Sequence, residues 1–192
     1  DVHDKLLRTQ DLKPIYFDDG LVVVDNKSGK IIDVGNFSDL RSSWDISNNL
    51  IHFRDRLIMP GFVDTHVHYP QYKVIASYGT SLLEWLNKYT FVEEQRFSDE
   101  AYADQIANLF LDELIKNGTT SVMTFCTSFK QSVEAFFNAA ENRNLRMVAG
   151  KVMMDRHAPD ELCDNPDNSY SDSKELIEKW HNKGRLRYAV TP

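Results

Sequence analysis

Two histidines, His66 and His68, flank Val67 in a mostly apolar stretch of the chain. In an extended strand, residues two positions apart project to the same face, so both imidazoles can reach one ion. Neutral imidazole binds zinc, iron, copper and nickel. Two surface histidines at the end of a strand would show the same spacing, so the pair alone is a weak signal. It predicts a metal site only together with the residues around it.

The residues around the pair predict a strand over 57–68 that ends at the histidines. Behind it, helical and extended patterns alternate, beginning with a helix that Ser98 can cap. An order of strand, helix, strand, helix is typical of an α/β fold with a parallel sheet or barrel. The expected helices cover 98–117, 131–144 and 172–184, and an Asp172–Glu175 capping box opens the last of them. The expected strands cover 119–127, 147–154 and 186–190. A polar loop is expected over 155–170.

The beginning of the chain shows a different pattern. Residues 15–36 predict a β-hairpin, with apolar runs on either side of an Asn-Lys-Ser-Gly turn, and residues 37–50 predict a loop. This antiparallel β element carries little core of its own. We therefore expect 1–57 to belong to a small β domain and 58–192 to the α/β domain.

The predicted α/β units are few for a complete barrel. Four units are half of a closed (β/α)8 barrel, which needs about 250 residues. An open, doubly wound sheet is the alternative, but no G-x-G-x-x-G follows the first strand and no G-x-x-x-x-G-K-[ST] occurs. The chain begins without Met and stops at Thr191-Pro192, directly after a strand. We expect it to be the front part of a longer protein.

The composition excludes several classes of protein. With 192 residues, 42% hydrophobic and 27% charged, the chain has globular rather than disordered or fibrous proportions. A formal net charge of −7 without a Lys/Arg stripe argues against a nucleic-acid partner, and no window of about 18 apolar residues predicts a membrane span. Two single cysteines, Cys126 in a predicted strand and Cys163 in a predicted loop, favour a reducing, cytoplasmic location.

The motif around the histidines resembles a known family. MPGFVDTHVH at 59–68 is similar to the first-strand motif of the amidohydrolase superfamily, and within it the chain resembles the guanine deaminases, bacterial members above all, over nearly all of 15–192. One departure is Val92, where the family has proline. The other matching segments are HYPQY at 68–72, LLEWLNKYTF at 82–91, NGTT at 117–120, GKVMMD at 150–155 and YAVTP at 188–192.

The resemblance implies a fold and a metal. The fold is a TIM (β/α)8 barrel of the metal-dependent hydrolase type with a small β-sandwich domain. Residues 58–192 would supply the first four β/α units, about half of the barrel, and 1–57 the N-terminal part of the sandwich. The resemblance also implies that His66 and His68 are two ligands of one Zn²⁺.

The resemblance further implies zinc-dependent hydrolysis of guanine to xanthine and ammonia by a cytoplasmic homodimer. His68, Tyr69, Pro70 and Gln71 would form this chain's part of the purine site, because the Gln71 amide offers the base both a donor and an acceptor. The family's acid/base glutamate and its remaining zinc ligands would follow residue 192. No catalytic residue is therefore expected within this chain, and the chain by itself is expected to be inactive.

Two other interpretations of function stay open. One is another amidohydrolase deaminase or chlorohydrolase that acts on a different amino-substituted heterocycle. The other is a non-catalytic, barrel-derived binding module, which applies if the chain truly ends at residue 192. A later H-x-x-E motif and a later Asp in the reading frame would favour the enzyme.

Several further residues allow two interpretations each. Trp85 and the leucines beside it can line a purine pocket or lid, or pack a short amphipathic helix onto the barrel or a partner subunit. His157 can face the mouth of the barrel, although a solvated loop position is the commoner situation. Glu93 and Glu94 are expected on a solvated helix face, since neighbouring helix positions do not face one site.

Overall fold

The computed structural model describes residues 14–45 and 49–192. The chain divides into two compact units between Ile58 and Met59. Residues 1–13 and 46–48 of the predicted β domain lie outside the described residues, and the β-sandwich stays a prediction. In the described ranges, no helix combines the length and the apolar character that crossing a bilayer requires.

The first unit contains the β-hairpin that the sequence predicts. Strand β1 (Gly20–Val24) pairs antiparallel with β2 (Ile31–Asn36), with a register shift between Val23 and Val24. The short helix α2 (Phe37–Leu40) forms where a loop is expected. Strand β2 keeps several apolar side chains exposed to solvent, namely those of Ile31, Ile32 and Val34.

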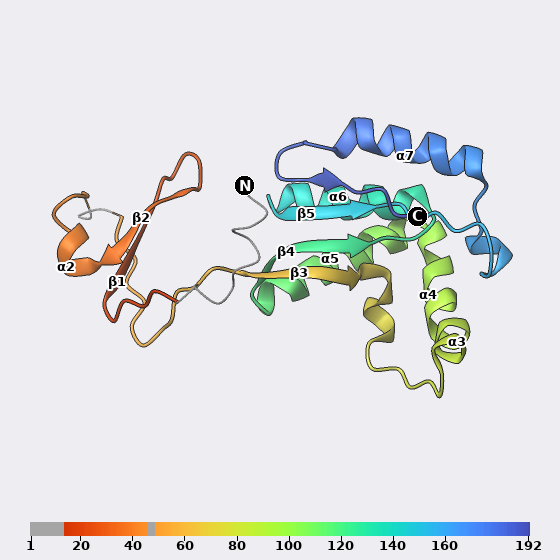
Figure 1. Ribbon diagram of the computed structural model, residues 1–192, viewed down its shortest axis with the longest axis horizontal. Coiled ribbons are helices and arrows are strands. Elements are labelled where there is room, and N and C mark those ends of the chain that lie inside the picture. Colours follow the sequence, from red (N-terminus) through yellow and green to blue (C-terminus); the bar gives the residue numbers. More distant parts are fainter. Residues whose placement is uncertain (1–13, 46–48) are drawn as a thin grey trace, which may run out of the picture. The chain divides into compact units, whose positions relative to one another are not determined.

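Four strands of the second unit form one parallel sheet in the order β3 (Phe62–His68), β4 (Thr119–Phe125), β5 (Arg146–Gly150) and β6 (Arg187–Tyr188). Their arrows point the same way in Figure 1. A doubly wound sheet reverses its strand order at a switch point, and no reversal occurs among these described strands. The order along the sheet is the one that a barrel requires.

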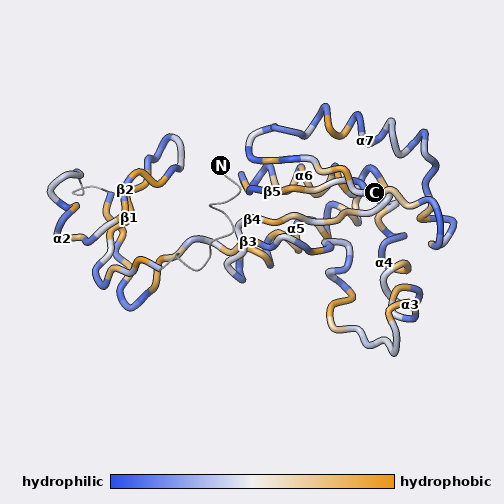
Figure 2. Tube along the Cα trace, in the orientation of Figure 1, coloured by the Kyte–Doolittle hydropathy of each residue, from blue (hydrophilic) through white to orange (hydrophobic). Residues whose placement is uncertain are grey.

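Three long helices connect these strands: α5 (Glu100–Lys116), α6 (Lys130–Asn142) and α7 (Pro166–Trp180). The strands are largely apolar in Figure 2, whereas α7 is mostly hydrophilic. Side chains alternate between the two faces of a strand. In β4, Val122 is 3% exposed beneath the helices, whereas the next residue, Met123, is 48% exposed on the opposite face. The helices therefore cover one face, and the other is open in the described part of the chain.

Aromatic rings form the centre of the core between the sheet and the helices. The Tyr69 ring lies 5.2, 6.0 and 5.3 Å, between centroids, from the rings of Phe97, Phe110 and Phe136. All of these rings are buried. Aromatic pairs at such distances add about 0.5–1.5 kcal/mol each beyond the burial of their area. The core thus fixes the segment that leaves β3 against α5 and α6.

Short helical turns separate β3 from α5. They run in the order η2 (Tyr69–Val74), α3 (Leu82–Trp85), η3 (Leu86–Thr90), α4 (Phe91–Gln95) and η4 (Arg96–Ser98), η3 being a π-helical turn. Figure 1 shows this excursion beginning at the carboxyl end of β3. It therefore starts where barrel enzymes place their functional groups.

The predicted start of α7 is wrong. Asp172 and Glu175 lie within the helix, and the residues before them, expected in a loop, are already helical. The helix begins after Asn165, whose side chain accepts a backbone hydrogen bond at 2.8 Å, with Pro166 in the first turn. An Asn N-cap followed by proline is itself a strong start signal. Asp172 and Glu175 instead pair with Lys130 of α6, a contact that links two helices.

The N-cap of α5 is Asp99 rather than Ser98. The Asp99 carboxylate accepts hydrogen bonds from the N–H groups of Ala101 and Tyr102, at 2.9 and 3.3 Å. Ser98 lies in the preceding turn, where its hydroxyl donates to the Gln95 carbonyl at 2.8 Å. A carboxylate at this position also interacts favourably with the helix dipole.

Gly150 ends β5 at a close approach of two backbone segments. A Cβ added at Gly150 would lie 1.8 Å from the carbonyl oxygen of Ala189. We expect Gly150→Ala to lower the free energy of unfolding by about 1–3 kcal/mol, because backbone must move to make room. Thermal unfolding measures the change. Gly35→Ala is the control, since its Cβ meets only the flexible Leu40 side chain; equal losses in the two variants would contradict the prediction.

Candidate functional site

His66 and His68 lie at the carboxyl end of β3, with ring centroids 5.3 Å apart and ring planes at 74°. Val67 between them packs against the core, so the two imidazoles belong to the face that the helices leave open. A β-bulge between Asp64 and Val67 shifts the register with β4, and Asp64 accepts a hydrogen bond from the His66 N–H at 3.0 Å. Bulges commonly re-aim side chains beside active sites. The structure thus brings the two predicted ligands together.

Phe125, the last residue of β4, supports both imidazoles from the neighbouring strand. It is the register partner of His68 and stacks on its ring at 4.6 Å with 16° between the planes. It also meets the His66 ring edge-on at 5.3 Å. The sequence prediction did not include Phe125. Its place at the carboxyl end of the next parallel strand is the signal that could have found it.

The histidine pair has the donor chemistry of a zinc site. Burial lowers the pKa of His68 by removing water from the imidazolium, and the nearby His66 acts in the same direction. The neutral imidazole that this favours is the form that binds a metal ion. Catalytic zinc usually has three protein ligands, and no group of three His, Cys, Asp or Glu is placed to hold an ion within 14–45 and 49–192. His66 and His68 therefore fit two of the three protein-ligand positions of such a site.

Tyr69 and Pro70 turn the chain away from the sheet directly after the histidines. The Tyr69 side chain is fully buried, and its hydroxyl donates to the Ser132 carbonyl at 2.6 Å. Its N–H donates to the Thr124 hydroxyl at 3.2 Å, which in turn donates to the Val67 carbonyl at 3.0 Å. The Tyr69 side chain and its N–H thus both belong to the core contacts of the fold.

Gln71 follows in η2, with its side chain partly exposed. Helix α4, which carries Glu94, packs against η2. Glu94 is only 7% exposed. Burial raises the pKa of Glu94 from 4.5 to about 7, because the charged form loses water, and the Gln71 amide acts in the opposite direction.

The prediction that Glu93 and Glu94 lie on a solvated helix face is wrong, since both are buried. Glu93 accepts a hydrogen bond from the Tyr102 hydroxyl and pairs with Arg96 at 3.2 Å. The Arg96 guanidinium also lies over the Tyr102 ring, 3.9 Å from its centroid. Neighbouring helix positions point about 100° apart, so the two carboxylates meet different partners.

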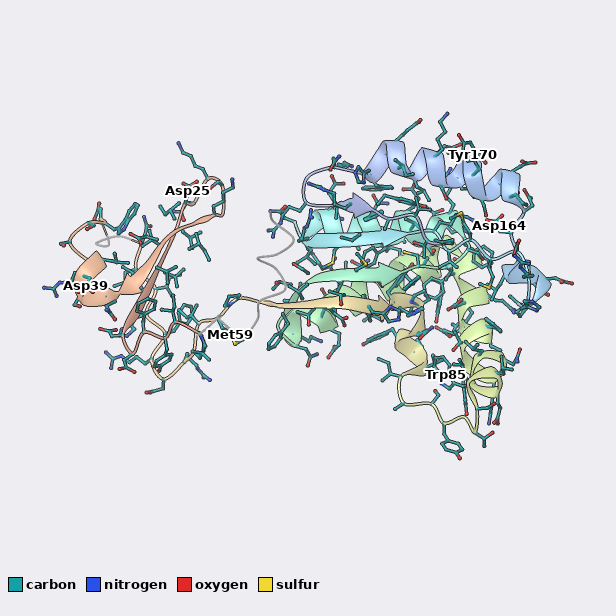
Figure 3. All side chains as sticks on the ribbon, in the orientation of Figure 1. Asp25, Asp39, Met59, Trp85, Asp164 and Tyr170 are labelled. Carbon is teal, nitrogen blue, oxygen red and sulfur yellow. The ribbon has the colours of Figure 1, made fainter. Side chains whose placement is uncertain are left out.

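Trp85 lies in α3 and is partly buried (Figure 3). Its backbone packs closely on Gly79, where an added Cβ would lie 2.7 Å from the Trp85 Cβ. The neighbouring Leu82 and Leu83 are 69% and 71% exposed. The two roles predicted for this segment, a lid over a purine or a packing surface, both stay open.

The remaining candidates lie outside the histidine site. His157 is exposed in the loop after β5, with a positive φ of 58°, so the solvated position is confirmed. Cys126 is buried immediately after β4, and Cys163 is a partly exposed loop residue after the turn η5 (Asp160–Leu162). Neither cysteine is among the residues whose rings contact His66 and His68.

Parallel strands in chain order, with paired imidazoles at the carboxyl end of the first, fit part of a metal-dependent hydrolase barrel. The profile of the Amidohydrolase family matches residues 57–192. The chain belongs to this family, and membership implies both the barrel and a metal.

Known relatives are similar to this chain both in sequence and in structure. Guanine deaminase from Escherichia coli (strain K12) is 48% identical over 177 residues, which are 92% of this chain and 40% of that protein. The solved structure of E. coli guanine deaminase superposes with a TM-score of 0.86, covering 90% of this chain and 40% of that one. Guanine deaminase from C. acetobutylicum with bound guanine in the active site is 36% identical, with a TM-score of 0.79 over 89% and 40%. The chain thus spans 40% of the length of these relatives.

The burial of Glu94 predicts a pH dependence of stability. Its pKa is 4.5 without burial and about 7 in the fold. As the pH rises through this window, the unfolded chain releases the proton first, so stability falls from its full value below pH 4.5 to a lower plateau above about 7. The loss is on the order of 3 kcal/mol, from 1.36 kcal/mol per pKa unit.

Glu94→Gln removes this loss, so the stability advantage of the variant over the native protein should grow with pH across the same window. Chemical unfolding at several pH values measures it. Gln95→Ala disturbs the same helix without adding or removing a titrating group, and should keep the native pH profile. Parallel profiles for Glu94→Gln and the native protein would contradict the prediction.

Proposed function

We propose that the whole protein is a zinc-dependent guanine deaminase that hydrolyses guanine to xanthine and ammonia. The paired imidazoles at the end of the first barrel strand carry the proposal, supported by the 48% identity with the E. coli enzyme. A guanine-bound relative with a TM-score of 0.79 supports guanine as the substrate.

The proposed architecture extends the described units. Met59–Pro192 would form the first four β/α units of the barrel, about half of it, and the hairpin unit would be the N-terminal part of a small β-sandwich. The sequential parallel strands support the first assignment. The exposed apolar side chains of β2 support the second, because further strands would cover them.

In the proposed mechanism, His66 and His68 hold the metal through neutral imidazoles. When bound, zinc supplies the Lewis acidity that makes water a nucleophile at neutral pH. Water adds at the ring carbon that bears the amino group, the carbon–nitrogen bond breaks, and ammonia leaves. Gln71 orients the purine through its amide. The proton transfers need a carboxylate, which by resemblance to the family follows residue 192.

The proposal includes a cytoplasmic homodimer. Both cysteines are unpaired, which supports a reducing compartment. The excursion after β3 exposes apolar side chains that a partner subunit can cover: Ile75, Tyr78, Leu82 and Leu83. Chromatography of the whole protein with light scattering measures the number of subunits.

Ammonia release by the purified whole protein tests the activity directly. We expect turnover of guanine and little or none of 8-oxoguanine, adenine or amino-triazines, since the likeness to guanine deaminases is strongest. Preferred turnover of another amino-substituted heterocycle would establish the alternative deaminase or chlorohydrolase. No turnover of any of them would favour the non-catalytic binding module.

Metal binding gives a separate test. We expect His66→Ala to abolish zinc content and guanine turnover together, because it removes one of the two imidazoles that meet at 5.3 Å. Elemental analysis of the dialysed whole protein measures the metal. His157→Ala is the matched control: the side chain is an exposed loop histidine, so zinc and activity should stay at native levels. Undiminished zinc in His66→Ala would refute the assignment.

A further inference from the structure

The β-bulge in β3 decides which face of the sheet receives the histidine pair. Asp64 pairs with Val122 of β4. The next pair in the register joins Val67 to Thr124, so β3 contains one residue more than β4 between the two pairs. Both β4 residues are buried beneath the helices, and a shift of one residue moves every later side chain to the other face of a sheet. Without the extra residue, His66 would lie beside Thr124 on the covered face. The bulge therefore turns the histidine pair to the open face.

The same shift selects the side chain that lies beside the second histidine. Beyond the bulge, His68 is the register partner of Phe125. In an unshifted register this place would belong to Val67, and Phe125 would face an aliphatic side chain instead of an imidazole. The stacked contact with His68 at 4.6 Å and the edge contact with His66 at 5.3 Å both depend on this register.

Ring contacts restrain the two imidazoles in the described part of the chain. A metal-bound histidine ordinarily donates its second ring N–H to a carboxylate, a backbone carbonyl or water, and this bond fixes the orientation of the ring. Within 14–45 and 49–192, the bond between His66 and Asp64 uses the backbone N–H of His66, and no ring nitrogen of His66 or His68 is hydrogen-bonded to a described residue. The rings instead contact Phe125 and each other.

We propose that Phe125 is a positioning residue that holds both imidazoles in the orientation in which they bind one metal ion. The inference rests on the proposed function, because that function assigns a metal to His66 and His68. The Phe125 ring lies at 16° to the His68 ring and limits its rotation, and its contact with His66 limits the other ring. Rings that are already oriented lose less conformational freedom when the metal binds, which strengthens binding. The apolar ring also restricts the access of water to the ligands.

The zinc affinity of the whole protein tests this role. We expect Phe125→Leu to raise the Kd for Zn²⁺ about tenfold, the combined effect of losing two aromatic contacts. Phe125→Tyr keeps the planar ring, so its Kd should stay within about twofold of the native value. Competition with a chelator measures the Kd. Thermal unfolding of the metal-free variants measures separately what each change costs the fold.

Met123→Leu is the matched control and should keep the native Kd. Met123 lies on the same open face of β4, two residues before Phe125, and is not the register partner of either histidine. A Kd of Phe125→Leu close to the native value would overturn the inference. An equal rise in Phe125→Tyr would overturn it too, because the planar ring would then not be what matters. If Phe125→Leu does not fold, Phe125→Met replaces it, and the same rise is required.

A spectroscopic readout in the metal-free protein separates this inference from the proposed function. A stacked aromatic ring shields the protons of the ring that it covers. With selective histidine labelling, the His68 ring signals should therefore move downfield in Phe125→Leu and stay in place in Met123→Leu. Unchanged His68 signals in Phe125→Leu would overturn the inference even in an active enzyme. A native protein that binds zinc but does not turn over guanine overturns the proposed function alone.

Discussion

The burial of the Tyr69 ring in the aromatic core determines where the chain leaves the sheet. Full burial of a large side chain contributes about 1.5–3 kcal/mol, and the hydroxyl adds a buried bond to the Ser132 carbonyl. The backbone at the same point is held by Thr124, which bonds both the Tyr69 N–H and the Val67 carbonyl. His68 precedes this anchor and Gln71 follows it. One core residue therefore holds the histidine pair and Gln71 in a single geometry.

The division of the sheet into a covered and an open face explains why the histidines are available for chemistry. Val67 packs into the core, and the alternation of a strand then places its two neighbours on the other face. Phe125 reaches the same face from β4 and contacts both imidazole rings. The apolar core and the accessible histidine rings thus lie on opposite faces of the same strands.

The segment between β3 and α5 shows how two adjacent carboxylates take different roles. Glu93 is neutralised by Arg96 and joins three elements. Glu94 is buried without such a partner, and its pKa is raised to about 7 as a result. Groups with shifted pKa values gather at functional sites, and the helix that carries this one packs against η2, which follows the histidine pair.

Much of the fold could be predicted from local patterns. The histidine spacing, the hairpin turn and the alternation of strand and helix are short-range features of the chain, and all three are found in the structure. The start of α7 was also encoded locally, in Asn165 and Pro166, but the capping-box pattern of Asp172 and Glu175 predicted a later start. Lys130, distant in sequence, is the residue with which Asp172 pairs.

The tertiary structure alone determined which side chains are buried and which partners they contact. It placed Phe125 against the imidazoles, and it buried the side chains of Glu93, Glu94 and Tyr69. The sequence by itself determined which residues can bind a metal ion and which segments carry them, because those properties depend on side-chain chemistry and on the periods of helix and strand. Burial and partner choice depend on which surfaces meet after folding, and no local period specifies that.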